Sequence, residues 1–253
     1  MVGPLSYIGG KRTLAKRIIE IFPKHTTYVE AFAGGAQVFF HKEPSKVEVL
    51  NDLDGEIVNF FRVCQQHYEE LIRYCRFIVV SRRWFDLLKV IDPAMLTDVQ
   101  RAARWLYLLK GSFASLVNRP NYHWHVVQPP SFNLERLPQL IENAHKRLER
   151  VQIECLPYEE IFKRYDRPET LFYLDPPYYG RKLYRYNFEN EDFGKLAERL
   201  AGVKGKFILS LNDVPEVRTL FRRFRVQGLD LAYSAQKRAG RRYKEVLITN
   251  FKP

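Results

Sequence analysis

The run at residues 171–178, Leu-Phe-Tyr-Leu-Asp-Pro-Pro-Tyr, limits most strongly how this chain of 253 residues can fold. Its first four residues are apolar or aromatic, as in a buried strand, and an acid and two prolines then end that strand abruptly. Open α/β sheets bind their ligands beyond the carboxyl ends of their strands. The run therefore predicts an α/β fold with polar chemistry at the end of a central strand.

The Asp-Pro-Pro-Tyr segment at the end of this run indicates a specific chemistry. Pro177 favours an extended Pro176, and neither proline has an N–H, so the Pro176 carbonyl is held in one direction beside the Asp175 carboxylate. These two acceptors can take both hydrogens of an exocyclic amino group on a nucleobase and aim its lone pair at an electrophile. Tyr178 adds a flat face on which the base could stack. The alternative is an ordinary turn, which a bare Asp-Pro-Pro would more often be.

A second strand end carries a glycine turn. A strand at 27–31 leads into Phe-Ala-Gly-Gly-Ala at 32–36 and then into a helix from residue 37, which is how a nucleotide-binding βαβ unit opens. The next strand, at 47–50, ends in Asn51 and Asp52, where an acid can accept hydrogen bonds from ribose hydroxyls. Glycine turns alone are common, so this one gains its meaning from Asp52 and Asp175 at the other strand ends.

Helical periodicity dominates from residue 54 to about residue 150, and strand and helix alternate again from residue 152. Thr97, Asn133 and Asn190 are predicted helix caps. The chain ends with two strands, at 228–235 and 245–251, whose short connection favours an antiparallel hairpin. We interpret the middle of the chain as a helical insertion in an α/β sheet.

The charge balance favours a polyanionic partner. The 41 basic and 29 acidic residues give a net charge of +12, which fits nucleic acid first and an anionic membrane surface second. No apolar run is long enough for a membrane span, and the first residues lack the pattern of a signal peptide. Three widely spaced cysteines argue against a disulfide framework and a zinc site. We expect a protein of a reducing cytoplasm, associated with the nucleoid through DNA, that needs no metal.

Two basic runs, at 179–186 and 237–244, are suited to phosphate contacts, and the first could also stack on bases because tyrosines interleave its basic residues. A solvated basic surface is the alternative for each run. Loops at 111–120 and 121–125 add arginine and aromatic residues. The candidate DNA contacts are Arg119, Tyr122, Arg181, Lys182, Tyr184, Arg185, Lys237, Arg238, Arg241 and Arg242.

Four motifs, taken in order, resemble those of the Dam-like DNA adenine methyltransferases, including phage and restriction-modification relatives. They are Tyr-Ile-Gly-Gly-Lys at 7–11, Glu-Ala-Phe-Ala-Gly-Gly-Ala at 30–36, Asn-Asp at 51–52 and Asp-Pro-Pro-Tyr at 175–178. The resemblance implies a Rossmann-like seven-stranded methyltransferase sheet with a reversed C-terminal hairpin. It also implies a catalytic domain made of residues 1–59 and 151–253, with a mostly helical target-recognition domain inserted at 60–150.

The resemblance further implies S-adenosylmethionine as the cofactor and adenine N6 in duplex DNA as the acceptor. Asp175 and the Pro176 carbonyl, followed by Pro177, would orient the amino nitrogen, and Tyr178 would stack on a flipped adenine. The residues implied to hold the cofactor are Tyr7, Lys11, Glu30, Phe32, Gly34, Asp52 and Asp175.

The chain departs from the family pattern at Ala36, where glycine is usual, and at Ala31, where proline is common. Pro157 replaces an acidic or polar residue, so the contact to the cofactor adenine is unassigned, with Glu159 as a candidate. Two alternatives stay open: a non-catalytic DNA-binding protein of the same fold, and a methyltransferase acting on cytosine N4 or RNA. The recognition sequence and the oligomeric state, monomer or weak dimer, do not follow from the sequence.

Overall fold

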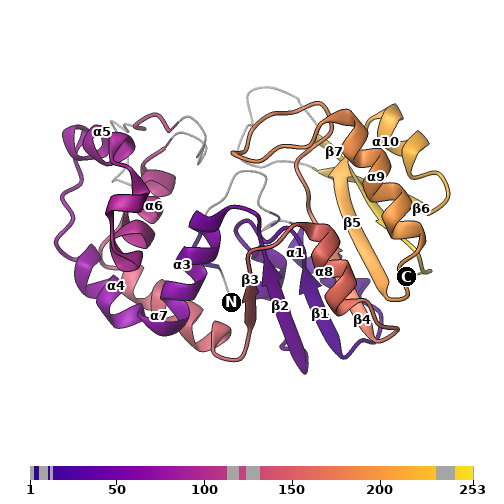
Figure 1. Cartoon of the computed structure of the whole chain (residues 1–253), viewed down its shortest axis with the longest axis horizontal. Coiled ribbons are helices and arrows are strands. Elements are labelled where there is room, and N and C mark those ends of the chain that lie inside the picture. The colour runs from indigo at the N-terminus through magenta and orange to yellow at the C-terminus, as the bar shows by residue number, and fades with distance from the viewer. Residues whose placement is uncertain are drawn as a thin grey trace.

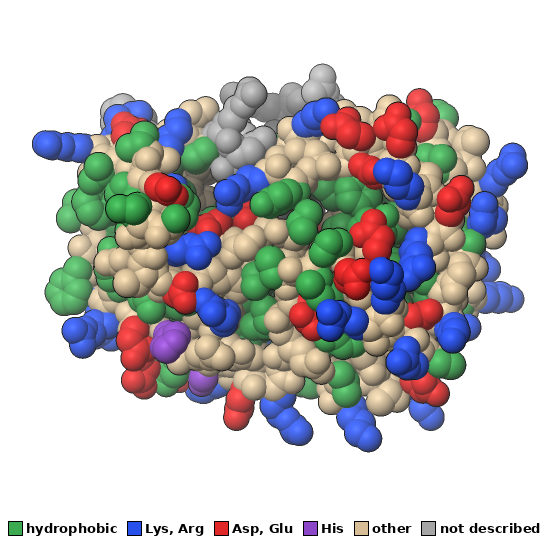
Figure 2. Space-filling model, in the orientation of Figure 1, with side chains coloured by type: hydrophobic (Ala, Val, Ile, Leu, Met, Phe, Trp, Pro, Cys, Tyr) green, Lys and Arg blue, Asp and Glu red, His purple; other side chains and the backbone are tan. Residues whose placement is uncertain are grey.

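The computed structural model describes residues 3–5, 11, 14–112, 120–123, 132–231 and 243–252. A mixed β-sheet with helices on both faces forms one part of the molecule, and a group of helices lies at one side of it (Figure 1). None of the helices in these ranges is long and apolar enough to cross a membrane. Lys and Arg side chains are spread over the face shown in Figure 2, with acidic side chains between them.

The sheet has seven strands in the order β3-β2-β1-β4-β5-β7-β6. The strands from β1 to β5 pair in parallel, whereas β7 runs antiparallel to both β5 and β6. Their bounds are β1 Thr27–Glu30, β2 Val47–Asn51, β3 Gln152–Glu154, β4 Thr170–Leu174, β5 Lys206–Asn212, β6 Arg225–Leu231 and β7 Tyr243–Thr249. The predicted seven-stranded α/β sheet with its reversed hairpin is confirmed.

Strand β4 is buried along its whole length because it pairs with β1 on one side and β5 on the other and is covered on both faces. Leu171 and Tyr173 belong to the apolar core on one face, and Phe172 and Leu174 to the core on the other. The order of the strands reverses between β1 and β4, since β2 and β3 continue to one side and β5 to the other. This is the switch point at which open α/β sheets bind ligands.

Helices around the sheet largely follow the predictions. They are α1 Ala15–Glu20, α2 Gln37–His41, α8 Tyr158–Tyr165, α9 Asn190–Ala201 and α10 Pro215–Leu220. The prediction that Asn190 caps α9 is wrong, because Glu189 is the N-cap and forms a capping box with Asp192. The carboxylate of Glu189 reaches the free N–H of the third helical residue, and Asn190 becomes the first helical residue.

Helices also dominate the middle of the chain, as predicted. They are α3 Gly55–Gln66, α4 Tyr68–Cys75, α5 Arg82–Val90, α6 Asp98–Gly111 and α7 Leu137–Leu148, with a 3-10 turn, η2, at Pro93–Met95. Thr97 caps α6 in a capping box, which confirms that prediction. Asn133 instead accepts hydrogen bonds from the N–H groups of Glu135 and Arg136 in a turn before α7, whose N-cap is Arg136.

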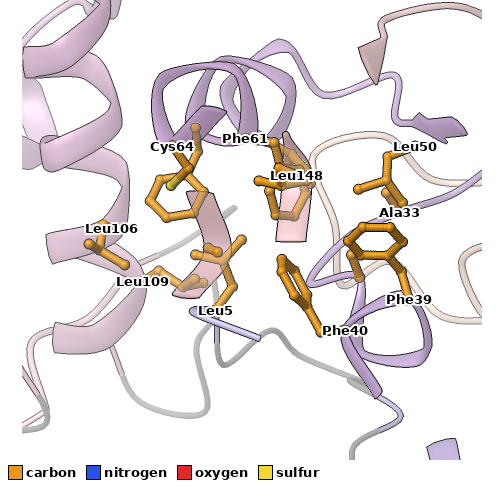
Figure 3. Close-up of a cluster of buried hydrophobic side chains, with 14 of the residues drawn as sticks. Leu5, Ala33, Phe39, Phe40, Leu50, Phe61, Cys64, Leu106, Leu109 and Leu148 are labelled. Carbon is orange, nitrogen blue, oxygen red and sulfur yellow. The ribbon is translucent and has the colours of Figure 1, made fainter. Parts of the chain in front are cut away.

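The helical region shares its core with the sheet. The rings of Phe61 on α3 and Phe40 on α2 have centroids 6.1 Å apart, and the buried side chains in Figure 3 come from both parts of the molecule. Helix α3 also runs through residue 60, which was the predicted start of the insertion. The division into a catalytic and a target-recognition domain stays a prediction.

Candidate active site

A pocket with about 880 Å³ of space, part of it open to solvent, lies at the switch point of the sheet. Its wall comes from Lys11, from residues at and after the carboxyl ends of β1, β2 and β4, from the start of α2 and from the segment 184–188. Five of the predicted cofactor residues line it together with Asp175, namely Lys11, Glu30, Phe32, Gly34 and Asp52. Tyr7 lies outside the described residues. Segments far apart in the chain therefore meet where the sequence predicts a ligand.

The glycine turn reaches the pocket through an unusual backbone conformation. Gly34 has φ 48°, and Ala36, the N-cap of α2, is also left-handed with φ 48° and ψ 38°. Residues other than glycine adopt this region at a cost, because Cβ approaches the backbone carbonyl oxygen. The family's glycine at this position thus has a conformational reason, and this chain accommodates alanine there.

Asp52 is held by the backbone on both oxygens. Its Oδ2 accepts from the Gly34 N–H at 2.8 Å and its Oδ1 from the Asp54 N–H at 2.9 Å. Burial raises the pKa of Asp52 to about 6, against the lowering effect of these N–H donors. Each carboxylate oxygen keeps a further lone pair, so Asp52 still has acceptor capacity toward the pocket.

Glu30 is a buried acid in the pocket wall. Its Oε1 accepts from the Tyr28 hydroxyl and from the Phe39 N–H, both at 2.7 Å. Burial raises the pKa of Glu30 to about 8. The carboxyl is therefore fixed in place by two donors, and its charge depends on what else enters the pocket.

Asp175 is joined to Lys11 in a buried cluster. The Lys11 ammonium is 4% exposed and lies 2.9 Å from Asp175 Oδ1 and 2.5 Å from Glu245 Oε1. It also donates a hydrogen bond to the Tyr178 hydroxyl at 2.7 Å. Burial would lower the pKa of Lys11, but Asp175, Tyr178 and Glu245 together raise it well above its ordinary value. Burial raises the pKa of Asp175 to about 6, with Lys11 opposing and Glu245 reinforcing the shift.

Tyr178 takes part in this cluster through its hydroxyl, which accepts from Lys11 and donates to Glu245 at 3.1 Å. The ring is half-buried and lies beside the pocket wall formed by the described residues. Its stacking on a base stays a prediction, and the geometry shows a hydrogen-bonding role as well.

Aromatic rings form a further part of the pocket wall. The ring centroid of Phe32 lies 5.5 Å from that of Tyr158 and 5.6 Å from that of Phe188. Tyr184 and Phe188 line the pocket, although the sequence suggested DNA contact for Tyr184 and no role for Phe188. Glu159, the candidate for the cofactor adenine, follows Tyr158 in the first turn of α8. Flat apolar surface is thus available for a ring.

The predicted DNA contacts are divided among several places. Arg181 and Lys182 are exposed, and Lys182 pairs with Glu189 at 2.6 Å. Arg185 lines the pocket and pairs with Asp54 at 3.1 Å. Tyr122 packs on Phe85 of α5, with ring centroids 5.3 Å apart. The remaining candidates, Arg119, Lys237, Arg238, Arg241 and Arg242, lie outside the described residues.

Sequence reasoning missed the polar residues that β5 and β7 contribute. Ser210 donates to Glu245 Oε1 at 2.5 Å, and the side chain of Asn212 pairs with both the N–H (2.9 Å) and the carbonyl (3.2 Å) of Tyr179. The available signal was a polar residue inside an apolar strand, Ser210 between Leu209 and Leu211.

Within the described ranges no group of three or more His, Cys, Asp or Glu side chains is placed to hold a metal ion.

Comparison with known proteins agrees with this geometry. Residues 7–234 match the family described as D12 class N6 adenine-specific DNA methyltransferase. A type II methyltransferase of Lactococcus lactis subsp. cremoris, M1.LlaDCHI, is 25% identical over 97% of this chain and 94% of its own length. The DNA adenine methylases of Vibrio cholerae and Escherichia coli K12 are 24% and 23% identical, each over 98% of this chain and 95% of their own length. The chain belongs to the D12 class of N6 adenine-specific DNA methyltransferases.

Proposed function

We propose that this chain transfers a methyl group from S-adenosylmethionine to the exocyclic N6 of an adenine that is flipped out of duplex DNA. The observation that carries the proposal is the juxtaposition of Asp175, at the end of β4, with a pocket lined by Asp52 and the glycine turn. The carboxylates and aromatic rings that line the pocket suit a cationic molecule that carries a diol and a flat ring.

The residues around the pocket have distinct roles in this proposal. Asp52, held by two backbone N–H groups, accepts from the ribose hydroxyls, and Gly34 lets the backbone approach closely. Glu30 and Phe32 line the pocket, so Glu30 would face the cationic end of the cofactor and Phe32 would pack against its adenine ring. When bound, the sulfonium supplies a reactive methyl group, so orientation and a fixed electrostatic environment supply most of the acceleration.

Asp175 acts as an acceptor rather than as a base. Its carboxylate and the Pro176 carbonyl take the two amino hydrogens of adenine, which directs the N6 lone pair at the methyl carbon. The N–C bond forms as the C–S bond breaks and its electron pair stays on sulfur, after which N6 loses one proton to solvent. Because Asp175 must be ionised to accept well, we expect methyl transfer to weaken as the pH falls below its pKa of about 6.

DNA reaches the pocket over the exposed segment after Tyr178. Arg181 and Lys182 are exposed there and contact phosphates, and the net charge of +12 favours duplex DNA at long range. Residues 60–150 provide the target-recognition region. The bacterial and phage sources of two of the relatives fit a cytoplasmic site of action, in a bacterium or a phage-infected cell.

Transfer of labelled methyl groups to a duplex of mixed sequence tests the proposal. The wild-type chain is expected to label adenine, whereas Asp175→Ala is expected to bind DNA without labelling it. Full labelling by Asp175→Ala would overturn the role of Asp175. Binding of DNA without labelling by the wild-type chain would favour a non-catalytic DNA-binding protein, and label on cytosine or on RNA would change the acceptor.

A further inference from the structure

Glu245 is a buried acid that the proposed reaction does not use. It lies on β7, where it pairs with Asn212 of β5 and Leu229 of β6, and it is 3% exposed. Three donors converge on its Oε1: the Lys11 ammonium at 2.5 Å, the Ser210 hydroxyl at 2.5 Å and the Tyr178 hydroxyl at 3.1 Å. Burying a carboxylate is costly unless it is paired and hydrogen-bonded, and Glu245 is both.

Lys11 is the link between Glu245 and Asp175. One ammonium serves both carboxylates, and the Tyr178 hydroxyl is its third partner. These three groups use the three N–H donors of lysine. Without the charge of Glu245, Lys11 and Asp175 would form a one-to-one ion pair, which would draw electron density of the Asp175 carboxylate toward the ammonium.

We propose that Glu245 is a positioning residue for methyl transfer: by sharing Lys11 and holding the Tyr178 hydroxyl, it leaves Asp175 a strong acceptor for the amino group. The inference rests on the proposed role of Asp175. It adds a residue from the reversed hairpin that is joined to Asp175 by the shared Lys11 ammonium.

Several titratable groups surround the cluster from the elements packed against it. Each of them interacts electrostatically with Asp175. They come from the segment before α1, from β1, from β4 and the residues after it, and from β7. They are Lys11, Glu30, Tyr173, Tyr178, Tyr184 and Glu245. Glu245 is the member whose charge raises the pKa of Asp175 without lining the pocket, so its removal changes Asp175 and leaves the described pocket wall intact.

The variant Glu245→Gln tests this in the free chain and in the reaction. In the free chain, the carboxyl carbon of Asp175, followed by NMR across pH, is expected to titrate about one pH unit lower than in the wild type, because a like charge has gone. In the reaction, kcat is expected to fall by about tenfold to a hundredfold with a smaller change in the KM for cofactor. In a plot of kcat against pH, the fall of kcat on the acidic side is expected to move to lower pH.

Two further variants separate charge from structure. Glu245→Asp keeps the charge on a shorter side chain, so we expect the wild-type position of the acidic limb with a reduced kcat. Glu48→Gln removes another buried, ion-paired glutamate, which lies on β2 and pairs with Lys42 and Arg147. It is expected to lower stability without moving the titration of Asp175 or the pH profile.

Two results would overturn the inference. The first is a titration of Asp175 that is unchanged in Glu245→Gln. The second is a Glu245→Gln variant that loses kcat but keeps the wild-type dependence of kcat on pH. If the proposed function itself fails, the wild-type chain does not methylate adenine at all. If only this inference fails, the wild type methylates and Glu245→Gln keeps its pH profile.

Discussion

Asp52 follows β2 and Asp175 follows β4, the two strands that flank β1 in the sheet. Burial raises the pKa of each to about 6, yet the two carboxyl groups are held in different ways. Backbone N–H groups of Gly34 and Asp54 hold Asp52, whereas the Lys11 side chain holds Asp175. Donors from the backbone keep their position through chemical steps and substitutions. The Lys11 ammonium is instead shared with Glu245, so a change at Glu245 alters how strongly it pairs with Asp175. In the proposed reaction Asp52 thus belongs to a fixed cofactor side, on β1 and β2, and Asp175 to an adjustable acceptor side, on β4, β5 and β7.

The largest expected effect separates these two sides. Asp175→Asn keeps the size of the side chain but removes its charge, so methyl transfer is expected to fall by about a thousandfold. Cofactor affinity, measured by calorimetry on the same sample, is expected to fall much less than the rate, because Asp175 is only one of the predicted cofactor residues in the pocket wall and Asp52 and the glycine turn are untouched. Equal losses in affinity and rate would show that the two sides are not separate.

Asp52→Asn tests the fixed side. An asparagine can accept from only one of the two backbone N–H groups and turns its own NH2 toward the other. We expect cofactor affinity to fall by about tenfold to a hundredfold and the free energy of unfolding by about 1–3 kcal/mol, with kcat at saturating cofactor little changed. Calorimetry and chemical unfolding measure the two. A large loss of kcat with normal affinity would contradict the assignment.

A pH series sharpens the comparison because activity and stability change in opposite directions. The pKa of Asp175 rises from its ordinary 3.8 to about 6 on folding, so protonation of Asp175 stabilises the folded state. This contribution to the stability of the wild type is lost as the pH rises through about 6. Asp175→Asn mimics the protonated acid. Its stability relative to wild type is expected to increase between pH 3.8 and about 6, while wild-type activity also increases. Urea unfolding of both proteins across this range measures the difference, and a constant difference would contradict a raised pKa.

The smallest expected effect concerns the backbone of the fixed side. Ala36 has φ 48° and is buried, so Ala36→Gly removes the cost of a left-handed alanine, about 1 kcal/mol. Unfolding in urea is expected to show a gain of that order, with cofactor affinity unchanged. A loss of stability would mean that packing of the Ala36 methyl outweighs the backbone cost.

The sequence predicted the part of the site that follows parallel strands. Residues 171–174 form one apolar run because β4 is covered on both faces, and the acid after them could only lie at the carboxyl edge of the sheet. Asp52 followed from the same reasoning. Local hydrogen-bonding patterns also sufficed for Thr97, whose capping box lies within four residues of sequence.

The remaining features depend on contacts between distant segments. Glu245 joins the site only because β7 inserts antiparallel between β5 and β6, which brings it to Ser210 and Tyr178. Arg185, whose predicted DNA contact stays a prediction, pairs with Asp54, and the segment 184–188 lines the pocket. No local pattern reveals either pairing, since both partners lie far along the chain.

The central claim is that this chain methylates adenine N6 in DNA through Asp175. The most direct test is methylation mapping of DNA from a host that lacks its own methylases and expresses either the wild-type chain or Asp175→Asn. We expect N6-methyladenine in a defined sequence context with the wild type and none with the variant. Unmodified DNA with the wild type, methyl groups on cytosine, or equal modification by the variant would contradict the claim.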